Sequence, residues 1–234
     1  MVGLELLIKN SNIPSNMYEI IVISSDQPDS PKIDWIEKQE IDITLVLEDN
    51  RKTVRKQSLY YYENIGIKRA KYSWILVCND DMWVECDWYE QFLTYITNTD
   101  KVYLVSSHIG SQGLGLRIPT IGTLTINGNE EPFWLYDMTI IHKMIYEKIG
   151  YLDESIGWYG KGADLGIAIG FLTDEKPIPC YNVKIHHDIE IEHRGDNISN
   201  QLLENHNSND FEYIRSKWNK WIMENNNNNK YIWI

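Results

Sequence analysis

Cysteine, basic residues and long apolar runs are all scarce in this sequence. Its 234 residues include only three cysteines (Cys78, Cys86 and Cys180), an odd number that excludes a disulfide framework and favours a reducing compartment. Lys and Arg number 22 against 34 Asp and Glu, a formal net charge of −12 that argues against sequence-independent binding to nucleic acid. No apolar run is long enough to span a bilayer, and the first ten residues lack the pattern of a signal peptide. We therefore expect a soluble, cytoplasmic protein.

The residues that are present favour one large folded domain. Hydrophobic residues make up 43% of the chain and nine are Trp, which is enough to build a core and rules out wholesale disorder. A length of 234 residues suits one large domain and is short for two. The acidity also fits a site that holds a divalent cation, although many acidic proteins bind none.

Strand-like and helix-like segments alternate in the first half of the chain. Short apolar runs predict strands at 18–24, 41–47, 72–78 and 102–106. Longer amphipathic stretches predict helices at 52–70 and 88–96. This alternation indicates an α/β domain with a largely parallel sheet.

The second half is less regular. A strand is expected at 120–126, followed by helices at 139–149, ending at Gly150, and at 163–172, and by strands at 178–187 and 189–193. A helix at 211–223 carries Trp218 and Trp221 on its apolar face, and an asparagine run follows it. That face fits packing on the chain's own domain, with peripheral membrane contact as the alternative.

The tripeptide Asn79-Asp80-Asp81 directly follows the apolar strand YSWILVC. In open α/β sheets, ligands bind beyond the carboxyl ends of the strands. Acidic side chains there supply the oxygen ligands that Mg²⁺ and Mn²⁺ prefer, and such metals often bridge to substrate phosphates. The alternative is an Asp-rich turn that caps a helix.

The context of this tripeptide resembles a known family. YEIIVISSDQPDS and ENIGIKRAKYSWILVCNDDMWVECDWYEQFL resemble the nucleotide-sugar half of family-2 glycosyltransferases of the GT-A fold. Their Asn-x-Gly-x-x-x-Ala helix is matched by Asn64, Gly66 and Ala70, and their DxD metal motif by Asn79 and Asp81. KMIYEKIGYLDESIGWYGKGADLGIAIG resembles the acceptor region, and IEHRGDNIS the late His-x-x-Gly segment. The resemblance spans residues 4 to 200.

The resemblance implies a single-domain, three-layer α/β/α sandwich with a mostly parallel mixed sheet. Residues 1–106 would form the nucleotide-sugar half and residues 107–200 the acceptor half. Residues 201–234 would add an amphipathic helix and an Asn-rich tail.

The resemblance also assigns roles to individual residues. It implies that Asn79, Asp81 and His193 hold Mn²⁺ or Mg²⁺ and that Asp164 is the general base of an inverting transfer. Apart from the resemblance, Trp158 and Tyr159 precede the Gly160-Lys161-Gly162 segment and Asp164, so their rings suit stacking on an acceptor sugar, with core packing as the alternative. The residues expected to contact the donor are Ser24, Ser25, Asp29, Asn64, Asp80 and Arg194. Ordinary alternatives stay open: Asp164 as a carboxylate at a helix N-terminus, Asp29 as a turn former and His193 as a loop histidine.

Three positions depart from the family pattern. Ser24 and Ser25 stand where the family has two acidic residues, and Asn79 opens the metal motif. The family's first strand has almost no room before the first helix-like segment. Either residues 4–8 serve as that strand, or the wall that binds the base is incomplete or built differently.

We therefore predict a metal-dependent, inverting glycosyltransferase that moves a sugar from a nucleotide-diphosphate donor to a hydroxyl of a glycan or glycoconjugate. One alternative is a non-catalytic nucleotide- or carbohydrate-binding protein with the same fold. A nucleotidyltransferase would usually show a Gly-rich basic loop near its N-terminus, which is not visible. A metal hydrolase would use the same acids and histidines, but their spacing matches no zinc pattern.

Overall fold

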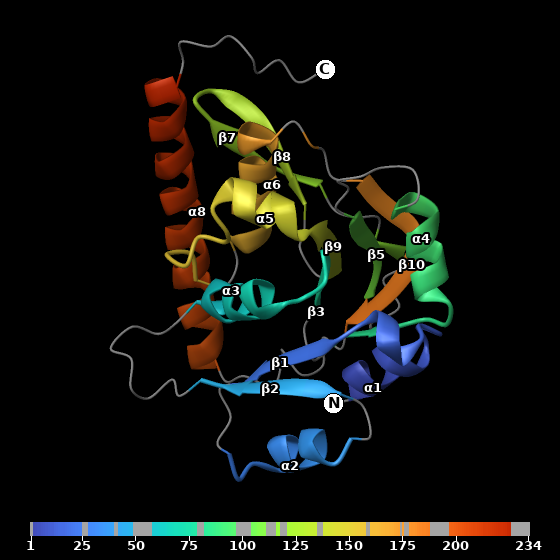
Figure 1. The fold of residues 1–234 in the computed structure, drawn as a ribbon. Coiled ribbons are helices and arrows are strands. Elements are labelled where there is room, and N and C mark those ends of the chain that lie inside the picture. Colours follow the sequence, from blue (N-terminus) through green and yellow to red (C-terminus); the bar gives the residue numbers. More distant parts are fainter. Residues whose placement is uncertain are drawn as a thin grey trace.

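Helices and strands follow one another along most of the chain in a computed structural model of the protein (Figure 1). The described residues are 2–24, 28–39, 42–48, 58–78, 82–96, 104–110, 116–117, 121–134, 138–157, 160–173, 175, 178–187 and 197–225. The helices are α1 (Val2–Lys9), α2 (Pro31–Glu37), α3 (Leu59–Arg69), α4 (Trp88–Ile96), α5 (Lys143–Ile149), α6 (Lys161–Leu172) and α8 (Asn197–Asn225), with a short 3-10 turn at Ser15–Met17. The strands are β1 (Ile20–Ser24), β2 (Ile43–Leu47), β3 (Trp74–Cys78), β4 (Met82–Val84), β5 (Leu104–Gly110), β6 (Leu116–Arg117), β7 (Ile121–Ile126), β8 (Asn129–Trp134), β9 (Met138–His142) and β10 (Ile178–His187).

The largest sheet is mixed, with strand order β3-β9-β5-β10-β4 and with β6 added to β5. β1 and β2 form a separate parallel pair, and β7 and β8 form an antiparallel hairpin. The α/β class is as predicted. The described pairings, however, are mostly antiparallel, because only β1 with β2 and β5 with β10 run in the same direction. The expectation of a mostly parallel sheet is therefore wrong for this part of the chain.

β9 accounts for two of the antiparallel pairings. The sequence pattern predicts one helix over 139–149, but the first part of that segment is a strand between β3 and β5, antiparallel to both. Residues 138–141 are all buried, so this strand is covered on both faces, and its run of β-branched residues suits that place. The helix α5 starts only at Lys143 and ends, as predicted, at Gly150, whose φ of +78° favours glycine.

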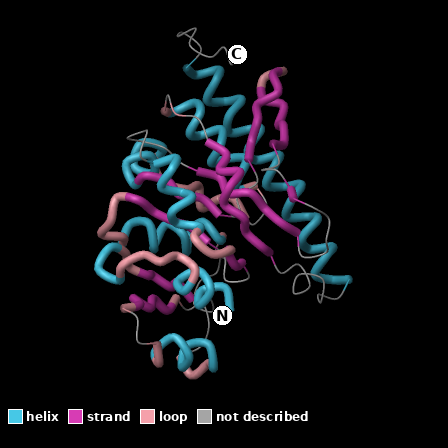
Figure 2. Tube along the Cα trace, turned by 90° about the vertical axis from the view of Figure 1, so that its right-hand side faces the viewer, coloured by secondary structure: helices cyan, strands magenta, loops and turns pink. Residues whose placement is uncertain are grey.

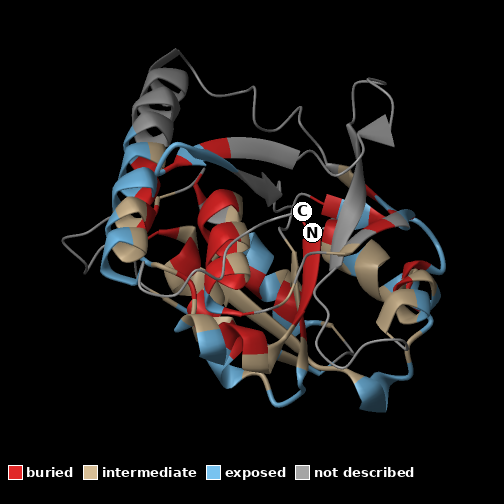
Figure 3. Ribbon diagram, turned by 90° about the horizontal axis from the view of Figure 1, so that it is seen from above, coloured by how far each residue is buried: buried red, intermediate tan, exposed pale blue. Residues whose placement is uncertain are grey.

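Apolar residues pack on both faces of the large sheet. Along β9, Met138 and Ile140 face the core shared with Trp88 and Phe92 of α4, whereas Ile141 faces the core shared with α3, α5, α6 and α8. Figure 3 shows the buried residues along the central strands and the helices beside them. Helices therefore cover the sheet on two sides, as expected for a three-layer α/β/α arrangement.

The C-terminal helix α8 joins the second of these cores. Ile214 and Trp218 are buried in it, and the Phe171 ring of α6 lies 5.3 Å from the rings of both Trp218 and Trp221. Figure 2 shows α8 as one long helix along one side of the molecule. Because α8 begins at Asn197, the predicted boundary at residue 200 falls inside it.

The N-terminal segment is helical. Residues 4–8 lie in α1, so the alternative in which they form a strand is wrong. α3 packs on β1, and a Cβ on Gly66 would lie 3.7 Å from Ile23, an ordinary contact distance. Within the described residues, no helix has both the length and the apolar character needed to cross a membrane.

Candidate functional site

Several predicted site residues lie outside the described residues. They are Ser25, Asn79, Asp80, Asp81, Trp158, Tyr159, His193 and Arg194. The predicted site residues that the structure describes are Ser24, Asp29, Asn64 and Asp164.

The segment 79–81 connects the last residue of β3, Cys78, to the first residue of β4, Met82. β10 ends at His187, whose backbone is directly opposite Met82 in the antiparallel ladder. The strand pairing thus brings the end of β10 to the residue that follows Asp81. The resemblance favours His193 as the histidine near this site because Arg194 and Gly195 follow it, and His193 lies outside the described residues.

The three predicted ligands of a divalent ion, Asn79, Asp81 and His193, lie outside the described residues. Among the described residues, no group of three His, Cys, Asp or Glu side chains is close enough to hold a metal ion. The donor chemistry of Asn79 and Asp81, an amide oxygen and a carboxylate, is nevertheless the kind that Mg²⁺ and Mn²⁺ bind.

Asp164 lies in the first turn of α6 and is almost completely buried, with 2% of its surface exposed. Lys217 Nζ of α8 lies 2.8 Å from Asp164 Oδ1 and 3.0 Å from Oδ2. The indole N–H of Trp218 also donates to Oδ1, at 2.8 Å. Both carboxylate oxygens are therefore engaged by α8.

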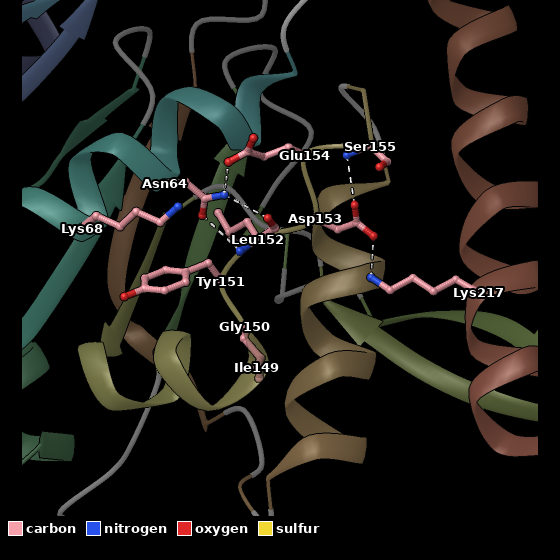
Figure 4. Close-up of a pocket in the computed structure, with 10 residues that line it drawn as sticks. All are labelled: Asn64, Lys68, Ile149, Gly150, Tyr151, Leu152, Asp153, Glu154, Ser155 and Lys217. Carbon is pink, nitrogen blue, oxygen red and sulfur yellow. Dashed lines mark hydrogen bonds and ion pairs between the residues drawn. The ribbon is translucent and has the colours of Figure 1, made fainter. Parts of the chain in front are cut away.

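The same lysine binds a second carboxylate. Lys217 Nζ lies 2.8 Å from Asp153 Oδ2, which also accepts a hydrogen bond of 3.0 Å from the Tyr213 hydroxyl. Asp153 Oδ1 accepts from the backbone N–H of Ser155 at 3.0 Å. Figure 4 shows Lys217 reaching from α8 toward Asp153. One ammonium group thus links α8 to α6 and to the loop after α5.

The two carboxyl groups respond differently to this ammonium. Burial raises the pKa of Asp164, and the charge and hydrogen bonds of Lys217 and Trp218 oppose that rise without cancelling it. At Asp153, burial also acts to raise the pKa, but the hydrogen bond and charge of Lys217 outweigh it and the pKa is lowered. Burial alone would lower the pKa of Lys217, but the two carboxylates raise it. Lys217 is therefore a stable cation at neutral pH.

This arrangement bears on the predicted role of Asp164 as a general base. A base must lie within hydrogen-bond reach of the proton that it takes. In the structure the Asp164 carboxylate faces Lys217 and Trp218, so it can reach an acceptor hydroxyl only after these partners separate from it. Sequence reasoning missed Lys217 and Asp153. One signal in the sequence pointed to Lys217: it is the direct neighbour of Trp218, which lies on the apolar face predicted for the helix at 211–223.

Asn64 is buried in α3 and holds the loop after α5. Its Nδ2 donates to the Leu152 carbonyl at 2.9 Å and to Glu154 Oε1 at 2.8 Å, and its Oδ1 accepts from the Leu152 N–H at 3.0 Å (Figure 4). Its amide is thus directed at this loop, which differs from the donor contact implied by the resemblance. The physical reason is burial: with 2% of its surface exposed, Asn64 needs protein partners for its polar atoms.

A cavity of about 460 Å³ lies between α3, this loop and α8. Its lining is polar and carries both charge signs; the lining residues are Asn64, Lys68, Ile149, Gly150, Tyr151, Leu152, Asp153, Glu154, Ser155 and Lys217 (Figure 4). Lys68 Nζ lies 4.8 Å from the centre of the Tyr151 ring, a cation–π contact. Several of these polar groups are paired with one another, as Asn64 is with Leu152 and Lys217 is with Asp153.

Ser24 and Asp29 lie in another part of the chain. Ser24 is the last residue of β1, and its carbonyl accepts from the Glu48 N–H at 2.9 Å. Asp29 is exposed in the turn before α2. The structure thus links Asn64 and Asp164 through the 152–155 loop and Lys217, whereas Ser24 ends β1 and Asp29 lies in the turn before α2.

Known proteins resemble this chain in structure more than in sequence. No protein-family model and no curated protein sequence matches it. S. aureus TarS 1-349 in complex with UDP-GlcNAc is similar, with a TM-score of 0.61 and 11% identity over 80% of this chain and 54% of that one. GalNAc-T7 with UDP, GalNAc and Mn²⁺ gives a TM-score of 0.57 and 14% identity over 79% of this chain and 40% of that one.

The mannosyltransferase PcManGT from Pyrobaculum calidifontis, in complex with GDP-Man and Mn²⁺, gives a TM-score of 0.55 and 13% identity over 80% of this chain and 52% of that one. The chain thus spans about half, or less, of the length of these solved proteins. At such low identity the likeness concerns the arrangement of helices and strands. The chain has the GT-A fold of these nucleotide-sugar glycosyltransferases.

Proposed function

We propose that this chain is a metal-dependent glycosyltransferase that moves a sugar from a nucleoside diphosphate to a hydroxyl of a glycan or glycoconjugate. The observation that carries this proposal is the GT-A fold, shared with three proteins solved with UDP, UDP-GlcNAc or GDP-Man. The predicted metal motif follows the end of a strand, β3, in the place where α/β proteins bind ligands.

The donor half of the proposed site uses residues at the ends of β1 and β3. Asn79 and Asp81 would hold Mn²⁺ or Mg²⁺, with His193 as a further ligand. A divalent ion bound there supplies positive charge to the departing diphosphate. Ser24, Ser25, Asp29, Asp80 and Arg194 would contact the nucleotide and the diphosphate.

In the acceptor half, Asp164 would take the proton of the acceptor hydroxyl, which implies inversion at the anomeric carbon. This step requires Lys217 and Trp218 to release the Asp164 carboxylate. Trp158 and Tyr159 would lie against the acceptor sugar.

A second candidate function is supported by the same contact. Because Asp164 is held by Lys217 and Trp218, a non-catalytic protein that binds nucleotide sugars or carbohydrates would also fit. Both candidates would bind the donor, but only the glycosyltransferase would turn it over.

The test is a thermal-shift panel with UDP-GlcNAc, UDP-GalNAc and GDP-mannose, each with and without Mn²⁺. A ligand that binds the folded state raises the midpoint of unfolding. We expect at least one donor to do so only with Mn²⁺, and Asp81→Ala to abolish that shift while Asp34→Ala, on the exposed side of α2, keeps it. If no donor shifts the wild-type protein, the proposal is wrong.

Release of the nucleoside diphosphate then separates the two candidates. A glycosyltransferase releases UDP or GDP from the bound donor, at least slowly to water, and Asp164→Asn abolishes the release while donor binding persists. Binding without release from any donor, with any acceptor glycoside in a screen, would favour the non-catalytic candidate.

A further inference from the structure

Trp83 and His186 form a flat aromatic pair on the edge of the large sheet. They are directly opposite each other in the β4–β10 ladder. Their rings are stacked, with centroids 3.6 Å apart and planes within 4° of parallel. In addition, His186 Nε2 lies 3.2 Å from Glu85 Oε1. The neighbouring ring and the carboxylate fix the orientation of the imidazole, and the imidazole in turn supports the indole.

This pair lies on the accessible face of the strands. Met82 and Val84 of β4 are buried in the core shared with α4, so Trp83, between them, points the opposite way. Trp83 is 36% exposed, a high value for so large an apolar residue, and the Glu85 side chain is 46% exposed. Packing in the core therefore does not account for the stack.

The pair is also close to the proposed catalytic centre. Trp83 is only two residues after Asp81, the carboxylate proposed to hold the metal. A strand advances about 3.4 Å per residue, so the two Cα atoms are separated by at most about 7 Å. A ligand on the indole would thus lie beside the reacting diphosphate sugar.

We propose that the Trp83–His186 stack, together with Glu85, is a subsite for a pyranose ring of the acceptor; this inference rests on the proposed glycosyltransferase function. The apolar C–H face of the sugar packs on the indole, and Glu85 accepts hydrogen bonds from its hydroxyls. A rigid, flat ring with a carboxylate at its edge suits a neutral sugar. The negative charge of Glu85 disfavours the donor diphosphate at the same spot.

The direct test is saturation-transfer NMR with the methyl pyranosides of glucose, galactose, mannose, GlcNAc and GalNAc, with Mn²⁺ omitted because it broadens the signals. The variants are Trp83→Thr, Trp83→Phe and, as the matched control, Tyr72→Thr, since Tyr72 is exposed to the same extent as Trp83. We expect at least one pyranoside to bind the wild-type protein, and Trp83→Thr to weaken its binding about fivefold or more. Trp83→Phe keeps part of the affinity and Tyr72→Thr keeps all of it.

Three outcomes would overturn the subsite: no pyranoside binds the wild type, Trp83→Thr binds as the wild type does, or Tyr72→Thr loses as much as Trp83→Thr. The same NMR measurement is made with uridine and guanosine. If Trp83→Thr weakens the binding of these nucleosides and not of the pyranosides, the stack binds a nucleobase instead of a sugar. Unchanged unfolding midpoints of the variants exclude a folding defect. The donor thermal-shift panel is independent of these measurements, so failure of the proposed function and failure of the subsite give different results.

Discussion

Lys217 Nζ contacts both oxygens of Asp164, at 2.8 and 3.0 Å, although the two residues are 53 positions apart in the chain. The same ammonium binds Asp153 at 2.8 Å. Since Lys217 belongs to α8 and the two acids belong to α6 and the 152–155 loop, this side chain links α8 to both, in addition to the packing of Ile214 and Trp218. The stability of these two segments and the accessibility of Asp164 therefore depend on α8.

Replacing Lys217 tests this relationship. Lys217→Met keeps most of the side-chain volume but leaves the Asp164 carboxylate, only 4% exposed as a side chain, without its cation. Removing one partner of a buried ion pair costs about 3–5 kcal/mol, and we expect about 3 because Lys217 itself is partly exposed. Urea denaturation measures the loss.

The matched control is Lys220→Met, one turn away on the same helix. Its side chain is 75% exposed, and its ammonium pairs with Glu224 at 3.9 Å. A surface pair of this kind contributes at most about 1 kcal/mol. Equal losses in Lys217→Met and Lys220→Met would show that the contacts of Lys217 with the two acids do not stabilise the fold.

The pH dependence of stability tests Asp153. Although burial acts to raise its pKa, Lys217, the Ser155 N–H and the Tyr213 hydroxyl lower it below the ordinary value of 3.8. A carboxyl with a lowered pKa in the folded state stabilises the protein above pH 3.8, and this contribution is lost as the pH falls through the folded-state pKa. Asp164, whose pKa is raised, contributes with the opposite sign and becomes less stabilising as the pH rises through its own pKa.

We therefore expect Asp153→Asn to lower the free energy of unfolding at neutral pH and to flatten its decline in acid. Urea unfolding between about pH 6 and pH 2.5 measures both effects. Asp34→Asn serves as the control, because its side chain is 63% exposed in α2 and, among the described residues, its ion-pair partner is Lys38 at the end of this helix. An acid decline as steep in Asp153→Asn as in the wild-type protein would contradict the assignment.

Local patterns are sufficient to predict the elements that carry a clear periodicity. α4 and β10 have the predicted bounds, and the α/β class follows from the alternation of such elements. The helix predicted over β9 is wrong because the conformation of β9 depends on burial between β3 and β5, which pair with it from distant parts of the sequence. Without knowledge of these pairings, the apolar residues of β9 are compatible with either a helix or a strand.

The candidate site shows the same division. The sequence pointed to Asp164 and Asn64, and the resemblance gave them functional roles. It could not show that their polar groups are engaged by Lys217, Trp218 and the Leu152 backbone, because these contacts join residues 53 to 88 positions apart. Side-chain partners at such separations depend on how the elements pack, which no local pattern contains.

Asn64 provides a test of this packing. Asn64→Ala removes both donors and the acceptor that hold Leu152 and Glu154, leaving the buried Leu152 backbone without partners. We expect Asn64→Ala to lower the free energy of unfolding by about 2–3 kcal/mol in urea denaturation.

Asn64→Asp keeps an acceptor for the Leu152 N–H but places a carboxylate beside Glu154, so it should not restore stability. Asn16→Ala is the control, since Asn16 is exposed and its backbone carbonyl, which the substitution keeps, accepts a hydrogen bond from the Tyr72 hydroxyl. Equal stability of Asn64→Ala and Asn16→Ala would contradict the role of Asn64.

Gly160 tests how closely α6 approaches α8. A Cβ at Gly160 would lie 2.5 Å from Ile214 Cδ1, a clash with a fully buried side chain, whereas a Cβ at Gly66 meets Ile23 at 3.7 Å. Gly160→Ala should therefore destabilise the protein by about 1–3 kcal/mol. Gly66→Ala should be neutral or stabilise it by up to about 1 kcal/mol, because glycine is unfavourable inside a helix.

Ile214→Val removes the clashing methyl group, so the Gly160→Ala/Ile214→Val double variant should lose less stability in urea denaturation than the sum of the two single losses. Strict additivity would mean that α6 and α8 can move apart to accept the methyl group. In that case the packing of Ile214 on Gly160 does not fix their spacing, and other contacts, among them those of Lys217 and Trp218 with Asp164, would hold α8 in place.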